Sequence, residues 1–164
     1  MITKKMQDTL NKQMNAELFS WYLYQSMAAW FETVNLSGMA RWMTAQAGEE
    51  MNHAMKIYRF IVERGGKVAL TEIGRPKAEW DSPQNAFEEA LAHERKITES
   101  IDACVAAART AGDNASEVFL QWYVTEQVEE EATATAIVEK FKMAGGFKGA
   151  LFMLDRELGM RGQG

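Results

Sequence analysis

A glutamate and a histidine stand three positions apart in the segment AGEEMNHAMK, a spacing at which both side chains could bind one metal ion. If the segment is helical, Glu50 and His53 lie on the same face, since residues three apart are neighbours on a helix surface. Carboxylate-rich sites with a single imidazole suit iron or manganese better than a closed zinc site. The chain contains no second Glu-x-x-His, so the other ligands must come from a different pattern.

The other ligands emerge when the two halves of the chain are aligned at one offset. The pairs that share a separation of 77 positions (94 − 17, 126 − 49, 127 − 50 and 130 − 53) are Glu17 with Glu94, Glu49 with Glu126, Glu50 with Gln127, and His53 with Glu130. Two related helical hairpins would bring these residues to one level around a pseudo-twofold axis. The sequence therefore predicts that the second half of the site is Gln127-x-x-Glu130.

Charge also favours a metal site at this level. A lone glutamate is usually a solvated surface residue, and the three glutamates at 129–131 by themselves would indicate only an acidic face. Glu17, Glu50 and Glu94 fit that interpretation poorly, because each interrupts an apolar stripe and an unpaired buried carboxylate is costly. The stripes contain no lysine or arginine, so two divalent cations are predicted to balance four carboxylates, with His53 as a neutral ligand.

Long helices must position these residues. Apolar side chains recur at steps of three and four, and no segment shows the alternation of a strand. The sequence predicts an all-α fold with one domain spanning residues 1–164. Ser82 before Pro83, and Asp113, are expected to cap the third and fourth helices. The expected helices cover residues 4–34, 38–64, 83–111, 114–144 and 147–159.

The lengths of the connections predict the topology. The first two helices, and the third and fourth, are joined by short turns, which makes each pair an antiparallel hairpin. The connection between residues 64 and 82 is much longer. Its 17 or so residues can extend roughly 55 Å, whereas a 27-residue helix is only about 40 Å long. A four-helix bundle with one long crossover loop and a short fifth helix is therefore expected.

Composition limits the classes of partner. The 164 residues carry a net charge of -5 and only two histidines, which argues against a nucleic-acid or anionic-membrane surface. No segment offers about 18 uncharged apolar residues, and the N-terminus lacks a signal-peptide pattern. A soluble protein of the cytoplasm is expected. Cys104, the single cysteine, cannot form an internal disulfide and is expected to be a small buried residue.

The ligand pattern, the segment LQWYVTEQVEEE and the short tail helix together resemble bacterial non-haem ferritin, within the ferritin-like di-iron bundle family, over the whole chain. The resemblance implies a shell of 24 identical subunits. It also implies ferroxidase activity, in which Fe(II) is oxidised with O2 or H2O2 and stored as a ferric oxide-hydroxide mineral. Iron is then the expected metal, and no haem is expected.

The resemblance also assigns roles to individual residues. Glu17, Glu50 and His53 would bind the first iron, and Glu50 would bridge to a second iron held by Glu94 and Glu130. Gln127 would lie beside the pair. The residues that match a third iron site are Glu49, Glu126, Glu129 and Glu130, and those that match electron-donating aromatics are Tyr24 and Trp122.

Several alternatives remain open at this point. Tyr24 could be only a hydrogen-bond donor in the core, Trp122 could be a packing residue, and His93 is expected at the surface. Bacterioferritin, which binds haem through a methionine at the position of Met51, has a second Glu-x-x-His that this chain lacks. The cysteine-rich domain of rubrerythrin is absent, and miniature ferritins lack the fifth helix. A helical adaptor without metal chemistry would leave the aligned polar positions unexplained.

Overall fold

A computed structural model describes residues 1–161 of the chain. Its helices are α1 (Lys4–Thr33), α2 (Ser37–Glu63), α3 (Pro83–Ala111), α4 (Asn114–Ala144) and α5 (Lys148–Leu158). The part of the chain described contains no β-strand. The predicted all-α fold, a four-helix bundle followed by a short fifth helix, is confirmed. No helix within residues 1–161 is both long enough and apolar enough to cross a membrane.

The helix ends follow local sequence signals. The Ser82 hydroxyl accepts a hydrogen bond from the backbone N–H of Asn85 (3.1 Å), directly before Pro83 at the first helical position. A carboxylate oxygen of Asp113 accepts from the N–H of Ser116 (3.1 Å). Both predicted N-caps are therefore confirmed. Gly112 ends α3 with a φ of 62°, a left-handed conformation that glycine adopts without steric cost.

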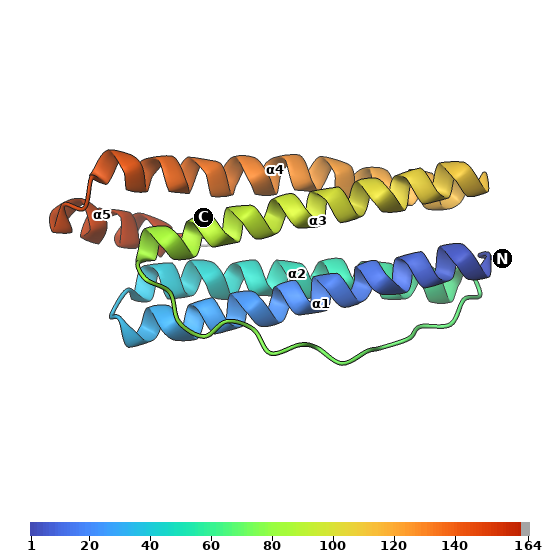
Figure 1. Cartoon of the computed structure of the whole chain (residues 1–164), viewed down its shortest axis with the longest axis horizontal. Helices are drawn as coiled ribbons and strands as arrows, with labels where there is room; N and C mark the ends of the chain where they lie inside the picture. The colour runs from blue at the N-terminus through green and yellow to red at the C-terminus, as the bar shows by residue number, and fades with distance from the viewer. Residues whose placement is uncertain (162–164) are drawn as a thin grey trace.

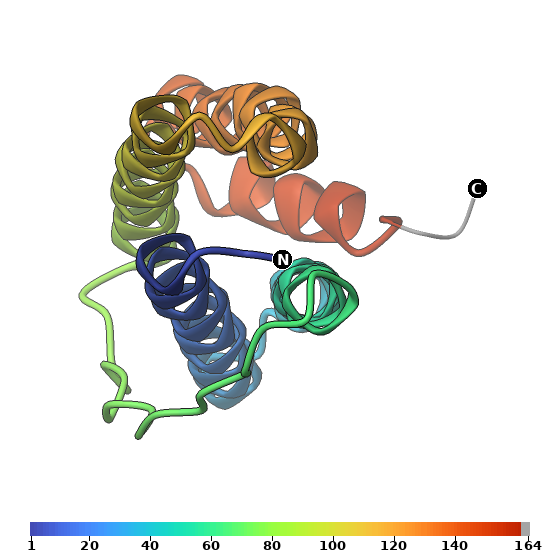
Figure 2. The same ribbon diagram turned by 90° about the vertical axis from the view of Figure 1, so that its right-hand side faces the viewer.

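The two hairpins, α1 with α2 and α3 with α4, lie side by side (Figure 1). The connection from residue 64 to 82 runs along the outside of α1, as both views show (Figures 1 and 2). Two asparagines of α1 hold it there. Asn11 donates to the carbonyl of Lys67 (2.9 Å), and Asn15 donates to that of Ala69 (2.9 Å). The long crossover predicted from loop length is thus present and fixed to the bundle.

The short helix α5 lies on one side of the bundle, between α2 and α4 (Figure 2). Its leucines Leu154 and Leu158 are buried in the core. The Asp155 carboxylate accepts a hydrogen bond from the backbone N–H of Met39 (2.8 Å), near the start of α2. A Cβ at Gly38 would lie only 1.8 Å from the Asp155 carbonyl oxygen, so glycine permits this close approach. The tail helix is therefore an integral part of the fold.

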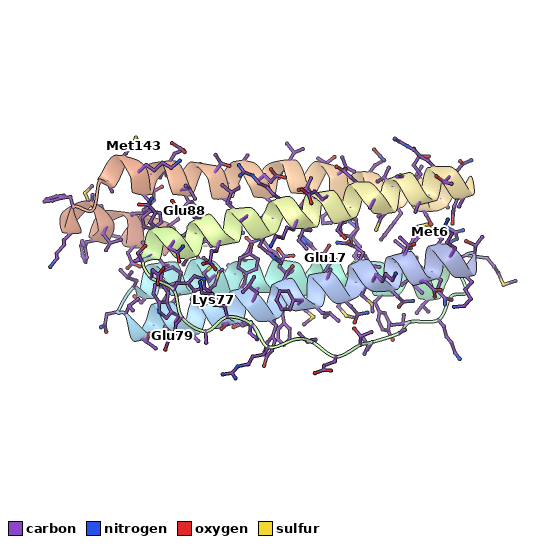
Figure 3. All side chains as sticks on the ribbon, in the orientation of Figure 1. Met6, Glu17, Lys77, Glu79, Glu88 and Met143 are labelled. Carbon is purple, nitrogen blue, oxygen red and sulfur yellow. The ribbon has the colours of Figure 1, made fainter. Side chains whose placement is uncertain are left out.

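The core consists of two apolar clusters with a polar layer between them. One cluster includes Phe31 and Phe87, and the other includes Leu10 and Ile101. Along each long helix the chain passes from one cluster to the other through a short polar stretch, such as the one around Glu17 in the middle of α1 (Figure 3). Each long helix thus contributes to the polar layer. Cys104 is buried, as predicted.

Candidate metal centre

The polar layer gathers six of the eight residues that the 77-residue offset aligns. Their side chains come from all four long helices and are almost fully buried. The members are Glu17, Glu50, His53, Glu94, Gln127 and Glu130, whose exposed fractions lie between 1% and 7%. A buried carboxylate normally requires a cation or several hydrogen bonds, so four of them in one layer call for compensation.

The first half of the layer has the geometry of a metal site. Glu17, Glu50 and His53 each offer one ligand atom, and these atoms lie within 4.8 Å of one another. The His53 Nδ1 atom is 3.4 Å from Glu50 Oε2. Within residues 1–161, the second, buried carboxylate oxygen of Glu17 has no hydrogen-bond partner. A cation bound here would satisfy this oxygen, so the donor set fits iron or another hard divalent metal.

A second group lies on the other side of the His53 ring. His53, Glu126 and Glu130 also offer ligand atoms within 4.8 Å of one another. The His53 Nε2 atom is 3.8 Å from Glu126 Oε1. The two ring nitrogens therefore face different carboxylates. The family resemblance implied a third iron site of Glu49, Glu126, Glu129 and Glu130, adjoining the pair. Glu129, which is exposed, and Glu49, which is half-buried, belong to neither group.

Amide and hydroxyl donors orient the carboxylates. Gln46 Nε2 donates to Glu50 Oε1 (2.9 Å) and to Glu130 Oε2 (2.8 Å), so it connects α2 with α4. Glu94 accepts a hydrogen bond from the hydroxyl of Tyr24 and one from Gln127 Nε2 (3.2 Å). These bonds hold the carboxylates in place at the centre of the layer.

Two glutamines that orient the carboxylates were not given this role in the sequence analysis. Gln13 is buried and donates from Nε2 to Glu17 Oε1 (2.8 Å). Gln46 also had no role assigned from the sequence. Both glutamines stand four positions before a glutamate of the layer, a spacing at which helix side chains meet. A glutamine four residues before Glu17 and another four residues before Glu50 were the available signal.

Burial and mutual repulsion favour the protonated form of these carboxyls. Burial, and then the neighbouring Glu50, raise the pKa of Glu17 to about 8. Burial, and then Glu94, raise the pKa of Glu130 to about 7. The pKa of Glu50 is raised well above its usual range by burial and by Glu94 and Glu130. A bound cation reverses this preference, so metal binding and proton release must be coupled.

Comparison with known proteins identifies the family. The profile described as "Ferritin-like domain" matches residues 7–144. The chain belongs to the ferritin family. A bacterial non-heme ferritin of Bacteroides fragilis is 42% identical over 98% of this chain and 100% of its own. One from Escherichia coli is 37% identical over 96% of both chains. The open pore ferritin of the archaeon Archaeoglobus fulgidus is 49% identical, with a TM-score of 0.97 over 98% of this chain and 99% of that one.

These relatives confirm the resemblance to bacterial non-haem ferritin, and none of them favours the haem-binding or adaptor alternative. The protein is therefore an iron-storage protein of the ferritin family, and iron is the metal that this membership implies. The carboxylate and histidine groups described above are where its own residues could bind that iron.

The aromatic residues of this ferritin lie in different surroundings. Tyr24 is buried, and its hydroxyl contacts Glu94 directly. Trp122 is 38% exposed, so the interpretation of Trp122 as a core residue is wrong. Its ring meets that of His53 edge-on, with 5.3 Å between centroids, and Lys56 Nζ lies 3.3 Å from its centroid. Both aromatics thus stand next to candidate ligands.

The expectation for His93 is also wrong. Its ring is half-buried rather than at the surface, because it turns towards α1 and packs against Phe19 and Tyr24. One ring nitrogen lies 2.8 Å from the Ser20 hydroxyl. Burial, and then the charge of Lys96, lower the pKa of His93 to about 4. A neutral histidine therefore links α1 and α3 beside the polar layer.

A side-chain cation reaches the edge of the layer from outside the four stripes. Arg161, which follows α5, donates from Nη2 to Glu49 Oε2 (2.6 Å). Because lysine and arginine are absent from the stripes, the sequence predicted metal ions as the counter-charges of the carboxylates at positions 17, 50, 94 and 130. That prediction did not consider the tail, which folds back onto α2.

Zn(II) binding to this ferritin should release protons, and more of them at low pH. At about pH 6, Glu17 and Glu130, with pKa values of about 8 and about 7, are mainly protonated in the metal-free protein and must lose their protons to bind. At about pH 9 both are ionised already. Calorimetry in buffers of different ionisation enthalpy measures the number released. Glu17→Gln should release fewer protons than the parent at the lower pH, and an enthalpy independent of the buffer there would contradict the prediction.

Proposed function

We propose that this ferritin is a ferroxidase, in which each subunit oxidises Fe(II) at a pair of iron sites in the polar layer. The observation that carries the proposal is the buried group of Glu17, Glu50 and His53, in which one carboxylate oxygen of Glu17 has no hydrogen-bond partner among the described residues. A buried carboxylate without a partner is costly, and a substrate cation removes that cost. Iron is the metal that the family stores, so Fe(II) is the proposed substrate.

The proposed ligand roles are those that the resemblance to bacterial non-haem ferritin implies, and the group of Glu17, Glu50 and His53 supports them. Glu17 and His53 bind the first iron, and Glu94 and Glu130 bind the second. Glu50 bridges the two, because one of its oxygens lies 3.4 Å from His53 while the other shares the Gln46 amide with Glu130. Two Fe(II) ions supply two electrons, the number that reduces O2 to H2O2, or H2O2 to two water molecules.

The neighbouring residues support the chemistry without adding metal charge. Gln127 holds the Glu94 carboxylate by a hydrogen bond. Tyr24 and Trp122 lie close enough to candidate ligands to supply an electron during turnover. Oxidation raises the total metal charge against an unchanged set of carboxylates, which weakens retention unless oxide or hydroxide enters. The proposed route for the Fe(III) product is the adjoining third site formed by Glu49, Glu126, Glu129 and Glu130.

Assembly is the second part of the proposal. The subunit exposes Phe147, Phe152 and Met153, each at least 70% accessible, on and beside α5. Apolar side chains of this size are a liability on a free monomer but fit a contact between copies. We propose a cytoplasmic shell of 24 identical subunits, with residues 1–164 as one unit.

The test combines three measurements on the purified protein. We expect the mass in solution to be that of 24 subunits, the oxidation of about two Fe(II) per O2 consumed in the first turnover, and retention of many iron atoms per shell. Zn(II) at saturating concentration should inhibit the oxidation, because it competes for the same carboxylates. A protein that binds iron but does not speed its oxidation over buffer would refute the ferroxidase proposal while leaving storage intact.

A further inference from the structure

Arg161 is held in a cradle on one face of α2, formed by Trp42, Gln46 and Glu49. Its Nη1 donates to Gln46 Oε1 (2.9 Å) and its Nη2 to Glu49 Oε2 (2.6 Å), while its guanidinium carbon lies 4.4 Å from the ring centroid of Trp42. Trp42, Gln46 and Glu49 are spaced by four and three positions, which places them side by side on the helix. A guanidinium that stacks on an indole and makes two directed hydrogen bonds is a built contact rather than a chance surface ion pair.

This cradle is connected to the metal centre. Gln46 accepts from Arg161 through its amide oxygen and donates from its nitrogen to Glu50 and Glu130. Because a guanidinium can only donate, it fixes which end of the Gln46 amide faces the two carboxylates. The side-chain amide of Gln46 therefore connects the positive charge of Arg161 to two candidate iron ligands, Glu50 and Glu130.

The same guanidinium forms an ion pair with a residue of the adjoining third site. Glu49 is one of the four glutamates proposed to bind a third iron, and in the structure one of its oxygens is bonded to Arg161. Arginine keeps its charge at every physiological pH, so the contact is not released by deprotonation. A metal ion that needs Glu49 must compete with it.

We propose that Arg161 is the resident counter-ion of Glu49, and that it competes with metal for this carboxylate and so lowers the metal affinity of the adjoining site. The inference rests on the proposed function, because the adjoining site is part of it. Competition by a tethered cation makes occupation of the site transient, which suits a site that passes Fe(III) onward. It also makes the affinity depend on whether the tail is docked, because Arg161 reaches Glu49 only when α5 lies against α2.

The test measures Zn(II) binding to the purified, assembled protein by calorimetry. No oxidation step is involved. Arg161→Gln should bind Zn(II) at the adjoining site roughly tenfold more tightly than the parent, the size of effect that neighbours of metal ligands usually have. Arg156→Gln is the matched control, because it removes an exposed arginine of α5 that is not in the cradle. The Zn(II) affinity of Arg156→Gln should match that of the parent. Equal affinities in Arg161→Gln and the parent would overturn the proposal.

A second comparison shows whether the effect passes through Glu49. In a Glu49→Gln background, Arg161→Gln should change the affinity little, since the carboxylate under competition has gone. A tenfold gain that persists there would overturn the proposal in favour of a general charge effect. A purely structural role for Arg161 would lower thermal stability in both backgrounds and leave the Zn(II) affinity unchanged.

The parent protein allows a test that does not depend on the folding of a variant. In crystals soaked with increasing Zn(II), Arg161 should leave Glu49 in those subunits whose adjoining site is filled. Metal bound by Glu49 beside an intact pair with Arg161 would overturn the proposal. A parent protein that bound no Zn(II) at all would instead refute the metal sites of the proposed function, and this inference with them.

Discussion

Glu50→Ala should abolish rapid Fe(II) oxidation while the subunit still folds and assembles. Glu50 lies between the two halves of the polar layer, near His53 through one oxygen and bonded to Gln46 through the other. In the proposed site, its removal would leave the two irons without a shared carboxylate. We expect the initial rate in stopped-flow absorbance to fall by more than about 100-fold, beyond the usual effect of losing a residue that only supports a ligand.

The same substitution, Glu50→Ala, should not lower the stability of the metal-free protein. Glu50 is 1% exposed, and its pKa is raised by burial and by Glu94 and Glu130. Removing one of several buried, mutually repelling carboxyls should therefore leave the metal-free protein as stable as the parent or more so. Glu63→Ala is the control, because Glu63 is an exposed glutamate of the same helix. An oxidation rate equal to that of the parent in Glu50→Ala would show that Glu50 is not the bridging ligand.

A chain that ends at Gly146 should lose the assembled shell and part of its thermal stability. The truncation removes α5 with its buried Leu154 and Leu158, and burial of each leucine contributes about 1.5 to 3 kcal/mol. It also removes the Asp155 carboxylate that accepts from the Met39 N–H near the start of α2. Light scattering after size exclusion should therefore give a mass far below that of the parent assembly.

The control for this truncation is a chain that ends at Arg161. It keeps α5, Asp155 and the contact between Arg161 and Glu49, so its mass and melting temperature should match those of the parent. If the chain that ends at Gly146 kept the mass of the parent assembly, the exposed apolar side chains near α5 would not be an assembly surface. A smaller mass in both truncated chains would point to the last three residues instead.

The amino-acid sequence by itself determined the helices and the level of the candidate site. Apolar residues at steps of three and four define a buried face on each helix, and a polar residue that interrupts such a face must be buried with it. The 77-residue offset then places Glu17 opposite Glu94 and His53 opposite Glu130, because the two hairpins are related. Local patterns and one internal repeat were sufficient for this, since both depend on spacing along the chain.

Only the tertiary structure decided which atoms meet. It places the two nitrogens of His53 towards different carboxylates and turns His93 inward towards Ser20. In the part of the chain that is described, it also leaves one oxygen of Glu17 without a hydrogen-bond partner. Arg161 contacts Glu49 across 112 positions of sequence. No helical period relates such residues, because their contact depends on how α5 packs across α2 and α4. Spacing along the chain therefore predicted the ligands, whereas packing between distant elements decided how they are oriented and which charges they meet.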